Sequence, residues 1–148
     1  MKTPPVHFFA RNTVTVAKEL LGKIISINDM SARIVETEAY KDDPASHAYK
    51  KTERSALMYD THGYVYVYLI YGMYYCINFT TEHHKPGAVL IRAVEPLTGI
   101  EEMKQRRKTD QIHNLCSGPG KLCHALGIDK TFNGTPLGKK VKVLDDGY

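Results

Sequence analysis

A stretch of alternating aromatic and branched residues dominates the hydrophobic pattern of this chain. Residues 64–69 alternate tyrosine with valine or leucine, and a second apolar run follows Tyr71-Gly72 and extends to residue 79. Period-two alternation of these residue types is typical of a β-strand. Gly72 can take a positive φ without steric cost, which favours a tight turn. We therefore predict a β-hairpin over residues 64–79. Three aliphatic side chains of its first strand should pack inward: Val65, Val67 and Leu69.

Shorter patterns predict the remaining elements. Helices are predicted over residues 13–22, 98–107 and 118–127, a single helical turn over 52–58, and strands over 23–28, 31–40, 88–93 and 140–144. The predicted N-caps are Thr13 or Thr15, then Thr98 in a capping box with Glu101, then Ser117 or Gly118, and the predicted C-terminal glycines are Gly22 and Gly127. The N-terminal arm should be anchored by Phe8 and Phe9. This mixture of strands and helices predicts a single α+β domain.

Two acidic residues stand close together in the predicted strand over residues 31–40. Strand alternation puts Glu36, Glu38 and Tyr40 on one face, and Val35, Thr37 and Ala39 on the other. One interpretation is a solvated strand face with two unremarkable acids. The other is a working carboxylate whose pKa is set by a cleft.

Arg92 and Lys121 can each be interpreted either as a structural residue or as part of a binding site. Arg92 interrupts an apolar run and needs an anionic partner, for which Glu95 is a nearby candidate. Gly120 and Lys121 lie at the predicted start of a helix, where free backbone N–H groups and a cation can hold a phosphate. A plain helix cap explains the same residues.

Composition narrows the class of protein. The chain has 148 residues, of which 43% are hydrophobic and 24% are charged, as expected for one globular domain. Its net charge of +4 suits a polyanionic partner without requiring one. The three cysteines form no Cys-x-x-Cys motif, the seven histidines lack ligand spacing, and no apolar leader or membrane span is recognisable. We expect reduced thiols, no metal, no cofactor and no membrane association.

A strand carboxylate, clustered tyrosines and basic residues near helix ends suit an enzyme that acts on a base or sugar in nucleic acid. They equally suit a nucleic-acid binding module.

Several segments, read in order, resemble the alkyladenine (3-methyladenine) DNA glycosylase family. They are FFARNTVTVAKELLGK, RIVETEAY, DDPASHAY, GYVYVYLIYGMYYCINF, AVLIRAVEP and CSGPGKLCHALGI. The resemblance covers most of residues 8–128. It implies a single domain built on a curved antiparallel sheet, with flanking helices and a β-hairpin that projects into the DNA minor groove.

The resemblance also implies roles for individual residues. Glu38 matches the general base that activates water for attack on C1′, and Arg92 matches the arginine that holds this water and an adjacent phosphate. Tyr40 and His47 match residues on one side of the flipped base. Tyr68 matches the ring that stacks on its other side.

Further matches concern selectivity and the DNA wedge. Asn78 matches the residue that excludes normal guanine by clashing with its amino group. Tyr71 matches the side chain that enters the minor groove and fills the gap left by the flipped nucleotide, with Met73 beside it.

The expected function is that of a monofunctional base-excision repair glycosylase, an N-glycosyl hydrolase of the 3-methyladenine type. Its expected substrates are 3-methyladenine, 7-methylguanine, hypoxanthine and ethenoadenine in double-stranded DNA. We expect a monomer in the cytoplasm at the nucleoid, or in the nucleus if the source is eukaryotic. The family pattern continues beyond KVLDDGY, whereas this chain ends at Tyr148, so residues 1–148 are expected to lack its C-terminal segment. A catalytically impaired module that binds damaged DNA is therefore the alternative.

Overall fold

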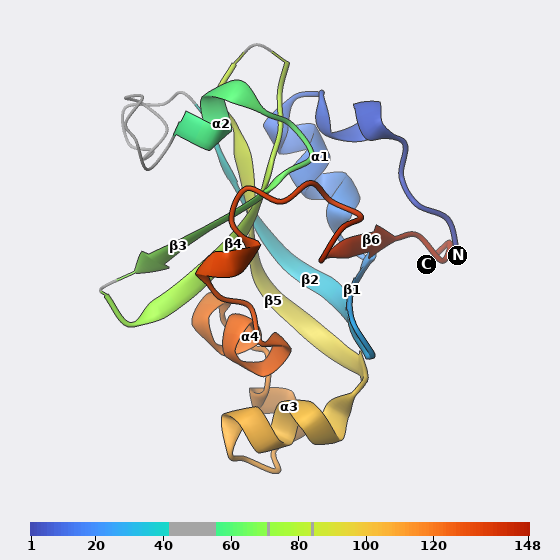
Figure 1. Cartoon of the computed structure of the whole chain (residues 1–148). Helices are drawn as coiled ribbons and strands as arrows, with labels where there is room; N and C mark the ends of the chain where they lie inside the picture. Colours follow the sequence, from blue (N-terminus) through green and yellow to red (C-terminus); the bar gives the residue numbers. More distant parts are fainter. Residues whose placement is uncertain (42–55, 71, 84) are drawn as a thin grey trace.

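A curled, six-stranded antiparallel sheet organises the chain in the computed structural model (Figure 1). The strands lie in the order β3-β4-β5-β2-β1-β6. Their bounds are β1 Ile24–Ile27, β2 Met30–Tyr40, β3 Val65–Ile70, β4 Tyr74–Thr80, β5 Ala88–Thr98 and β6 Lys142–Leu144. The structure describes residues 1–41, 56–70, 72–83 and 85–148. The predicted α+β class is confirmed, with β2 and β5 as its long central pair.

The helices pack around this sheet. They are α1 Thr13–Leu20, α2 Ala56–Asp60, α3 Ile100–Arg107 and α4 Pro119–Leu126, with short 3-10 turns at Val6–Phe9, Ile112–Asn114 and Lys130–Phe132. The main core gathers the inward residues of α1 and α4 with alternate residues of the strands, including Val65, Val67, Ile77, Phe79, Val89 and Ile91. Phe8 and Phe9 belong to the same core, so the predicted anchor of the N-terminal arm is confirmed. Among the described helices, none has the length and apolar composition that a bilayer crossing requires.

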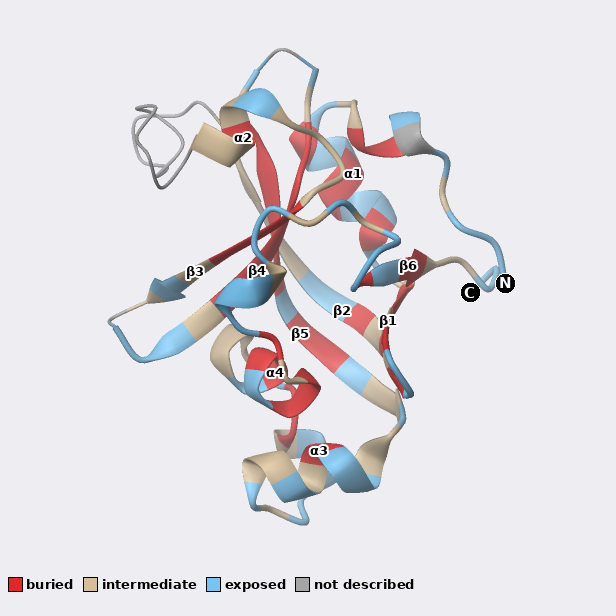
Figure 2. Cartoon of the chain, in the orientation of Figure 1, coloured by how far each residue is buried: buried red, intermediate tan, exposed pale blue. Residues whose placement is uncertain are grey.

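The predicted hairpin is formed by β3 and β4 and projects from the rest of the sheet (Figure 1). Val65 and Val67 are buried as expected, but Leu69 is 43% exposed. Figure 2 shows the physical reason, because burial decreases along both strands towards the tip. The tip of the hairpin projects beyond the core, so strand alternation no longer separates core from solvent at Leu69.

Two predicted caps are wrong. Asn12, and not a threonine, caps α1 by accepting hydrogen bonds from Val14 N and Thr15 N. The capping box at Thr98 does not form, because Thr98 Oγ1 bonds to Ser31 Oγ at 2.7 Å. Thr98 instead ends β5, and Gly99 leads into α3 with φ +76. Cross-strand pairing of Thr98 thus replaces local capping.

Strands β2 and β5 contain irregularities that affect the acidic segment. The pairing jumps from Ile34↔Val94 to Glu36↔Ala93, which leaves Val35 as an extra residue. Val35 is 47% exposed, whereas Ala39, which was predicted to share its face, packs against the main core. A β-bulge of this kind interrupts alternation and turns a side chain to the other side of a strand.

Candidate active site

Four strands contribute one residue each to a row across the sheet. Glu38 of β2 lies opposite Leu90 of β5, Leu90 opposite Asn78 of β4, and Asn78 opposite Tyr66 of β3. Residues directly opposite one another in antiparallel strands share a face of the sheet. This row therefore lies on the face that does not carry the main core. Because adjacent strands are about 4.8 Å apart, the backbones at Glu38 and Asn78 are about 10 Å apart.

The Glu38 carboxylate is held by two side chains of this face. Arg92 Nη1 donates to Glu38 Oε2 at 2.8 Å, and the Tyr40 hydroxyl donates to Oε1. The Glu38 and Arg92 side chains remain 39% and 48% exposed, so solvent and a ligand can reach them. Arg92 thus pairs with Glu38, and the nearby Glu95 is not its partner. The carboxylate is both fixed in position and accessible.

A second bulge brings Arg92 to this place. The pairing jumps from Glu36↔Ala93 to Thr37↔Ile91, so Arg92 has no partner residue on β2. The extra residue of a bulge is free to re-aim its side chain. Arg92 uses this freedom to contact the carboxylate of Glu38.

Tyr40 links this ion pair to the aromatic part of the face. Burial is the main reason why its pKa is raised, and the hydrogen bond to Glu38 raises it further. Tyr68 and Cys76 contribute less to the raised pKa of Tyr40.

The raised pKa of Tyr40 predicts a change in stability at alkaline pH. An unfolded tyrosine ionises near pH ~10, whereas folded Tyr40 keeps its proton to higher pH. The stabilisation from this tyrosine is thus present below pH ~10 and is lost as the pH rises further. Tyr40→Phe should lose less stability than the wild type between about pH 9 and about pH 11. Urea unfolding at both pH values measures this difference, and equal losses in the two proteins would contradict it.

A small apolar cluster supports the aromatic side of the face. Tyr66 and Met58 of α2 are buried together, and Tyr68 packs against them. The Tyr66 and Tyr68 rings lie 5.1 Å apart at 43°. Tyr68 is only partly buried, so its ring is supported from below and reachable from outside.

Asn78 is fully buried on β4. Its Nδ2 donates to Tyr66 O at 3.2 Å, which fixes the side chain against β3. Its Oδ1 has no hydrogen-bond partner within the part of the chain that the structure describes. A buried acceptor without a partner costs roughly 1–3 kcal/mol, and such costs concentrate at functional sites.

The remaining predicted residues lie elsewhere or outside the description. His47 and Tyr71 fall outside the described residues. Met73 is 70% exposed at the tip of the hairpin, followed by Tyr74 at 52%. Two exposed apolar side chains at a projecting tip suit insertion into a partner.

Gly120 and Lys121 lie in the first turn of α4. Lys121 Nζ donates to Asn114 Oδ1 at 2.8 Å and its side chain is exposed. A Cβ at Gly120 would lie 2.9 Å from Tyr74 Cδ1, so Gly120 allows the hairpin to approach α4 closely. The predicted N-cap at Gly118 and C-terminal glycine at Gly127 are confirmed. The structure thus assigns Gly120 a packing role, and its phosphate role stays a prediction.

Two residues of the face escaped the sequence analysis. Leu90 forms the floor between Glu38 and Asn78, and Cys76 lies opposite Tyr68. Strand alternation places Leu90 on the same face as Arg92 and on the opposite face from Val89 and Ile91. This pattern could have predicted that Leu90 belongs to the face of the candidate site. Within the described ranges, no group of three or more His, Cys, Asp or Glu side chains could hold a metal ion.

Comparison with known protein families gives a match over residues 7–147 to methylpurine-DNA glycosylase. The chain belongs to the methylpurine-DNA glycosylase family. The family match includes every strand and helix described above. It also includes Glu38, Arg92 and Asn78 of the candidate active site.

Individual relatives agree with this family assignment. A protein of Rhizobium johnstonii is 52% identical over 85% of this chain and 64% of its own length. A protein of Alkaliphilus oremlandii is 50% identical over 95% of this chain and 79% of its own length. A protein of Desulfitobacterium hafniense is 46% identical over 99% of this chain and 81% of its own length. Each is named as a candidate 3-methyladenine DNA glycosylase. The chain spans less than two thirds of the Rhizobium johnstonii relative.

Proposed function

We propose that the protein is a base-excision repair glycosylase that hydrolyses the N-glycosidic bond of damaged purines in duplex DNA. The observation that carries this proposal is the geometry of Glu38, whose two carboxylate oxygens accept from Tyr40 and Arg92 on an accessible face. A carboxylate held in this way can take a proton from an attacking water. It can also stabilise the oxocarbenium-like sugar that forms when the base leaves.

The arrangement of the face supports a division of labour. Glu38 activates the water that attacks C1′, and Arg92 orients Glu38, the water and an adjacent phosphate. This mechanism requires no lysine nucleophile, so we expect the enzyme to release the base without nicking the strand. Proton transfer by a positioned side chain contributes typically about 10²–10⁴-fold to the rate.

The flipped base would bind between aromatic rings. Tyr40 and His47 lie on one side of the base in this proposal, and Tyr68 lies on the other. Stacking contributes roughly 1–3 kcal/mol per base, and a positively charged alkylated purine is attracted further by ring faces. A damaged base also costs less to unstack, which favours lesions over normal bases.

Asn78 would act as the filter against normal guanine. It is buried and fixed by Tyr66, so it cannot move aside for a bulkier purine edge. The substrates of the enzyme would then include 3-methyladenine, 7-methylguanine, hypoxanthine and ethenoadenine.

Tyr71 and Met73 would enter the minor groove and fill the space left by the flipped nucleotide. The enzyme would act as a monomer. The reduced buried cysteines and the DNA substrate fit a cytoplasmic location at the nucleoid.

Base release from defined duplexes tests this proposal. Oligonucleotides that contain hypoxanthine, and methylated duplex DNA, are incubated with excess enzyme, and the free base and abasic sites are measured. Release from duplexes is expected, without strand nicking before alkaline treatment. Tight binding to an abasic analogue with no release would instead indicate a damage-binding module. Tyr71→Ala is expected to weaken binding to the abasic analogue by about tenfold, and an unchanged affinity would contradict the wedge.

A further inference from the structure

A segment with four lysines crosses from one edge strand of the sheet to the other. Residues 130–142, here called the lysine segment, contain no acidic residue. Its lysines are Lys130, Lys139, Lys140 and Lys142. Near its start, Val65 N and Val67 N of β3 donate to Thr135 O and Asn133 Oδ1, each at 2.8 Å. Its end enters β6, which pairs with β1.

The positive charge of this segment is largely uncompensated. All four lysines are exposed. Lys139, Lys140 and Lys142 form no ion pair with any residue that the structure describes. The acid that precedes the segment is Asp129, which accepts from Thr131 N at 2.9 Å. That bonding to Thr131 is the main cause of the lowered pKa of Asp129, and Lys140 and Lys130 contribute less.

Lys140 is held in place by neutral groups. Its Nζ lies 5.0 Å from the centre of the Phe132 ring. It also lies 3.4 Å from Thr131 O, to which it donates a long hydrogen bond. These contacts fix the position of the ammonium group and leave its charge available.

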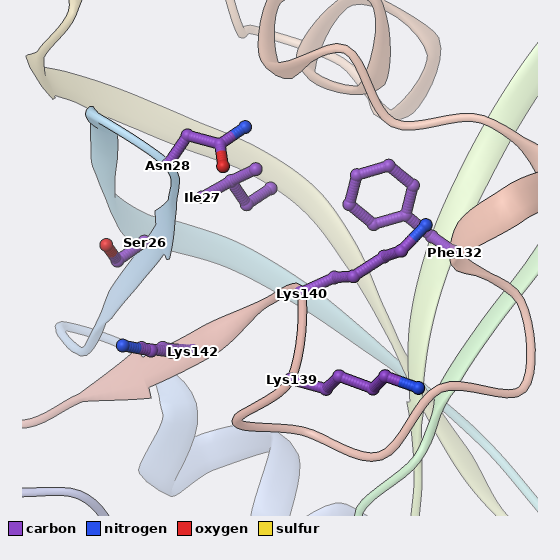
Figure 3. Close-up of a pocket in the computed structure, with 7 residues that line it drawn as sticks. All are labelled: Ser26, Ile27, Asn28, Phe132, Lys139, Lys140 and Lys142. Carbon is purple, nitrogen blue, oxygen red and sulfur yellow. The ribbon is translucent and has the colours of Figure 1, made fainter.

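A cavity of about 390 Å³ lies between this part of the segment and the turn from β1 to β2. Three lysines line it, together with Phe132, Ser26, Ile27 and Asn28. Figure 3 shows Lys139 and Lys142 extending in opposite directions and Lys140 rising towards Phe132. Because these ammonium groups are spread apart and do not meet at one point, they suit a partner with repeated negative charges better than one small anion.

We propose that the lysine segment binds the phosphate backbone of duplex DNA, through Lys139, Lys140 and Lys142. The segment is anchored to β3 through Asn133 and Thr135, and its three lysines lie beside β1, at the other end of the sheet. The contact would therefore be made with phosphates away from those next to the hairpin. This inference rests on the proposed function in that it takes the polyanion to be the DNA substrate. It adds a contact that acts on DNA of any sequence, damaged or not, because phosphate contacts carry no base information.

Salt-dependent binding to an undamaged duplex tests this proposal. The triple variant Lys139→Gln, Lys140→Gln, Lys142→Gln is compared with the wild type by fluorescence anisotropy on a labelled duplex of about 30 base pairs. Each lost phosphate contact should reduce the slope of log K against log[salt] by about 0.9, so the three together should reduce it by roughly 2–3. The affinity at moderate salt should fall roughly tenfold or more.

Two controls separate charge from structure. The triple Lys→Arg variant should keep the wild-type slope, because it retains all three charges. Lys18→Gln removes one exposed charge from α1 and should leave the slope unchanged. A wild-type slope in the triple glutamine variant, or an equal loss in the triple arginine variant, would overturn the proposal. So would unchanged DNA binding combined with lost binding to phosphatidylserine vesicles, which would assign the segment to a membrane.

The same variants distinguish this proposal from the proposed function. If the lysine-segment proposal is wrong, the triple glutamine variant will have the wild-type slope of log K against log[salt], while base release by the wild type remains intact. Failure of the glycosylase proposal would appear as absent base release from damaged duplexes, whatever the salt slope. The two results come from different DNA substrates and different readouts.

Discussion

Glu38→Gln is expected to reduce base release by a factor of about 10²–10⁴ while binding to damaged duplex changes only a few-fold. Glutamine keeps the shape of the side chain and can still accept from Tyr40. It cannot take a proton from water, and it removes the negative charge that Arg92 and a cationic sugar would meet. Single-turnover release of hypoxanthine, with enzyme in excess, isolates the chemical step. Anisotropy on an abasic analogue measures binding separately.

Glu36→Gln is the matched control for this experiment. Glu36 lies two residues before Glu38 in β2 and is exposed, and its side chain forms no hydrogen bond or ion pair with the described residues. Its substitution removes the same charge from the same strand and should leave the rate within about twofold, as is usual for an isolated exposed charge. Equal release by Glu38→Gln and the wild type would remove Glu38 from the mechanism, and equal losses in both variants would indicate a general electrostatic effect.

Gly87→Ala is expected to destabilise the fold by about 3 kcal/mol or more, although glycine and alanine differ by one methyl group. The added Cβ would lie 2.4 Å from Thr13 Oγ1 and 2.7 Å from Thr81 Oγ1. Both threonines are fully buried and hydrogen-bonded to each other at 2.9 Å. Thr13 N and Oγ1 also donate to Glu82 at the start of α1, so displacing Thr13 breaks several bonds together.

Thermal unfolding measures this effect. For a chain of this size, a loss of about 3 kcal/mol lowers Tm by roughly 6–12 °C. Gly118→Ala makes the same chemical change at an extended backbone position, φ −172, where the nearest atom is 3.9 Å from the added Cβ. It should cost less than about 1 kcal/mol. Similar Tm values for the two variants would show that the contacts around Gly87 relax freely.

The hairpin shows how far local patterns reach. Alternation over residues 64–79 predicted both strands, the turn near Gly72 and the burial of Val65 and Val67, and all are confirmed. The prediction was wrong only at Leu69, because exposure there depends on how far the hairpin projects beyond the core. A strand pattern specifies two faces, but the remainder of the molecule decides whether each face is covered.

The helix caps, unlike the hairpin, depend on contacts between segments that are distant in the sequence. Thr98 and Glu101 have the spacing of a capping box, yet Thr98 bonds to Ser31 on the paired strand β2. Glu82, in a loop that the sequence marks only as polar, accepts from the first residue of α1. Both outcomes depend on segments more than sixty residues away in the sequence, which no local pattern can report.

The sequence by itself determined the α+β class, the hairpin, the family, and the strand that carries Glu38 and Tyr40. These features depend on short-range periodicity and on ordered motifs that one chain displays in full. Only the tertiary structure decided that Arg92 pairs with Glu38 and not with Glu95, that Leu90 separates Glu38 from Asn78, and that three lysines gather beside β1. The physical reason is that bulges and strand pairing set these contacts, and both arise from the register between segments distant in the chain.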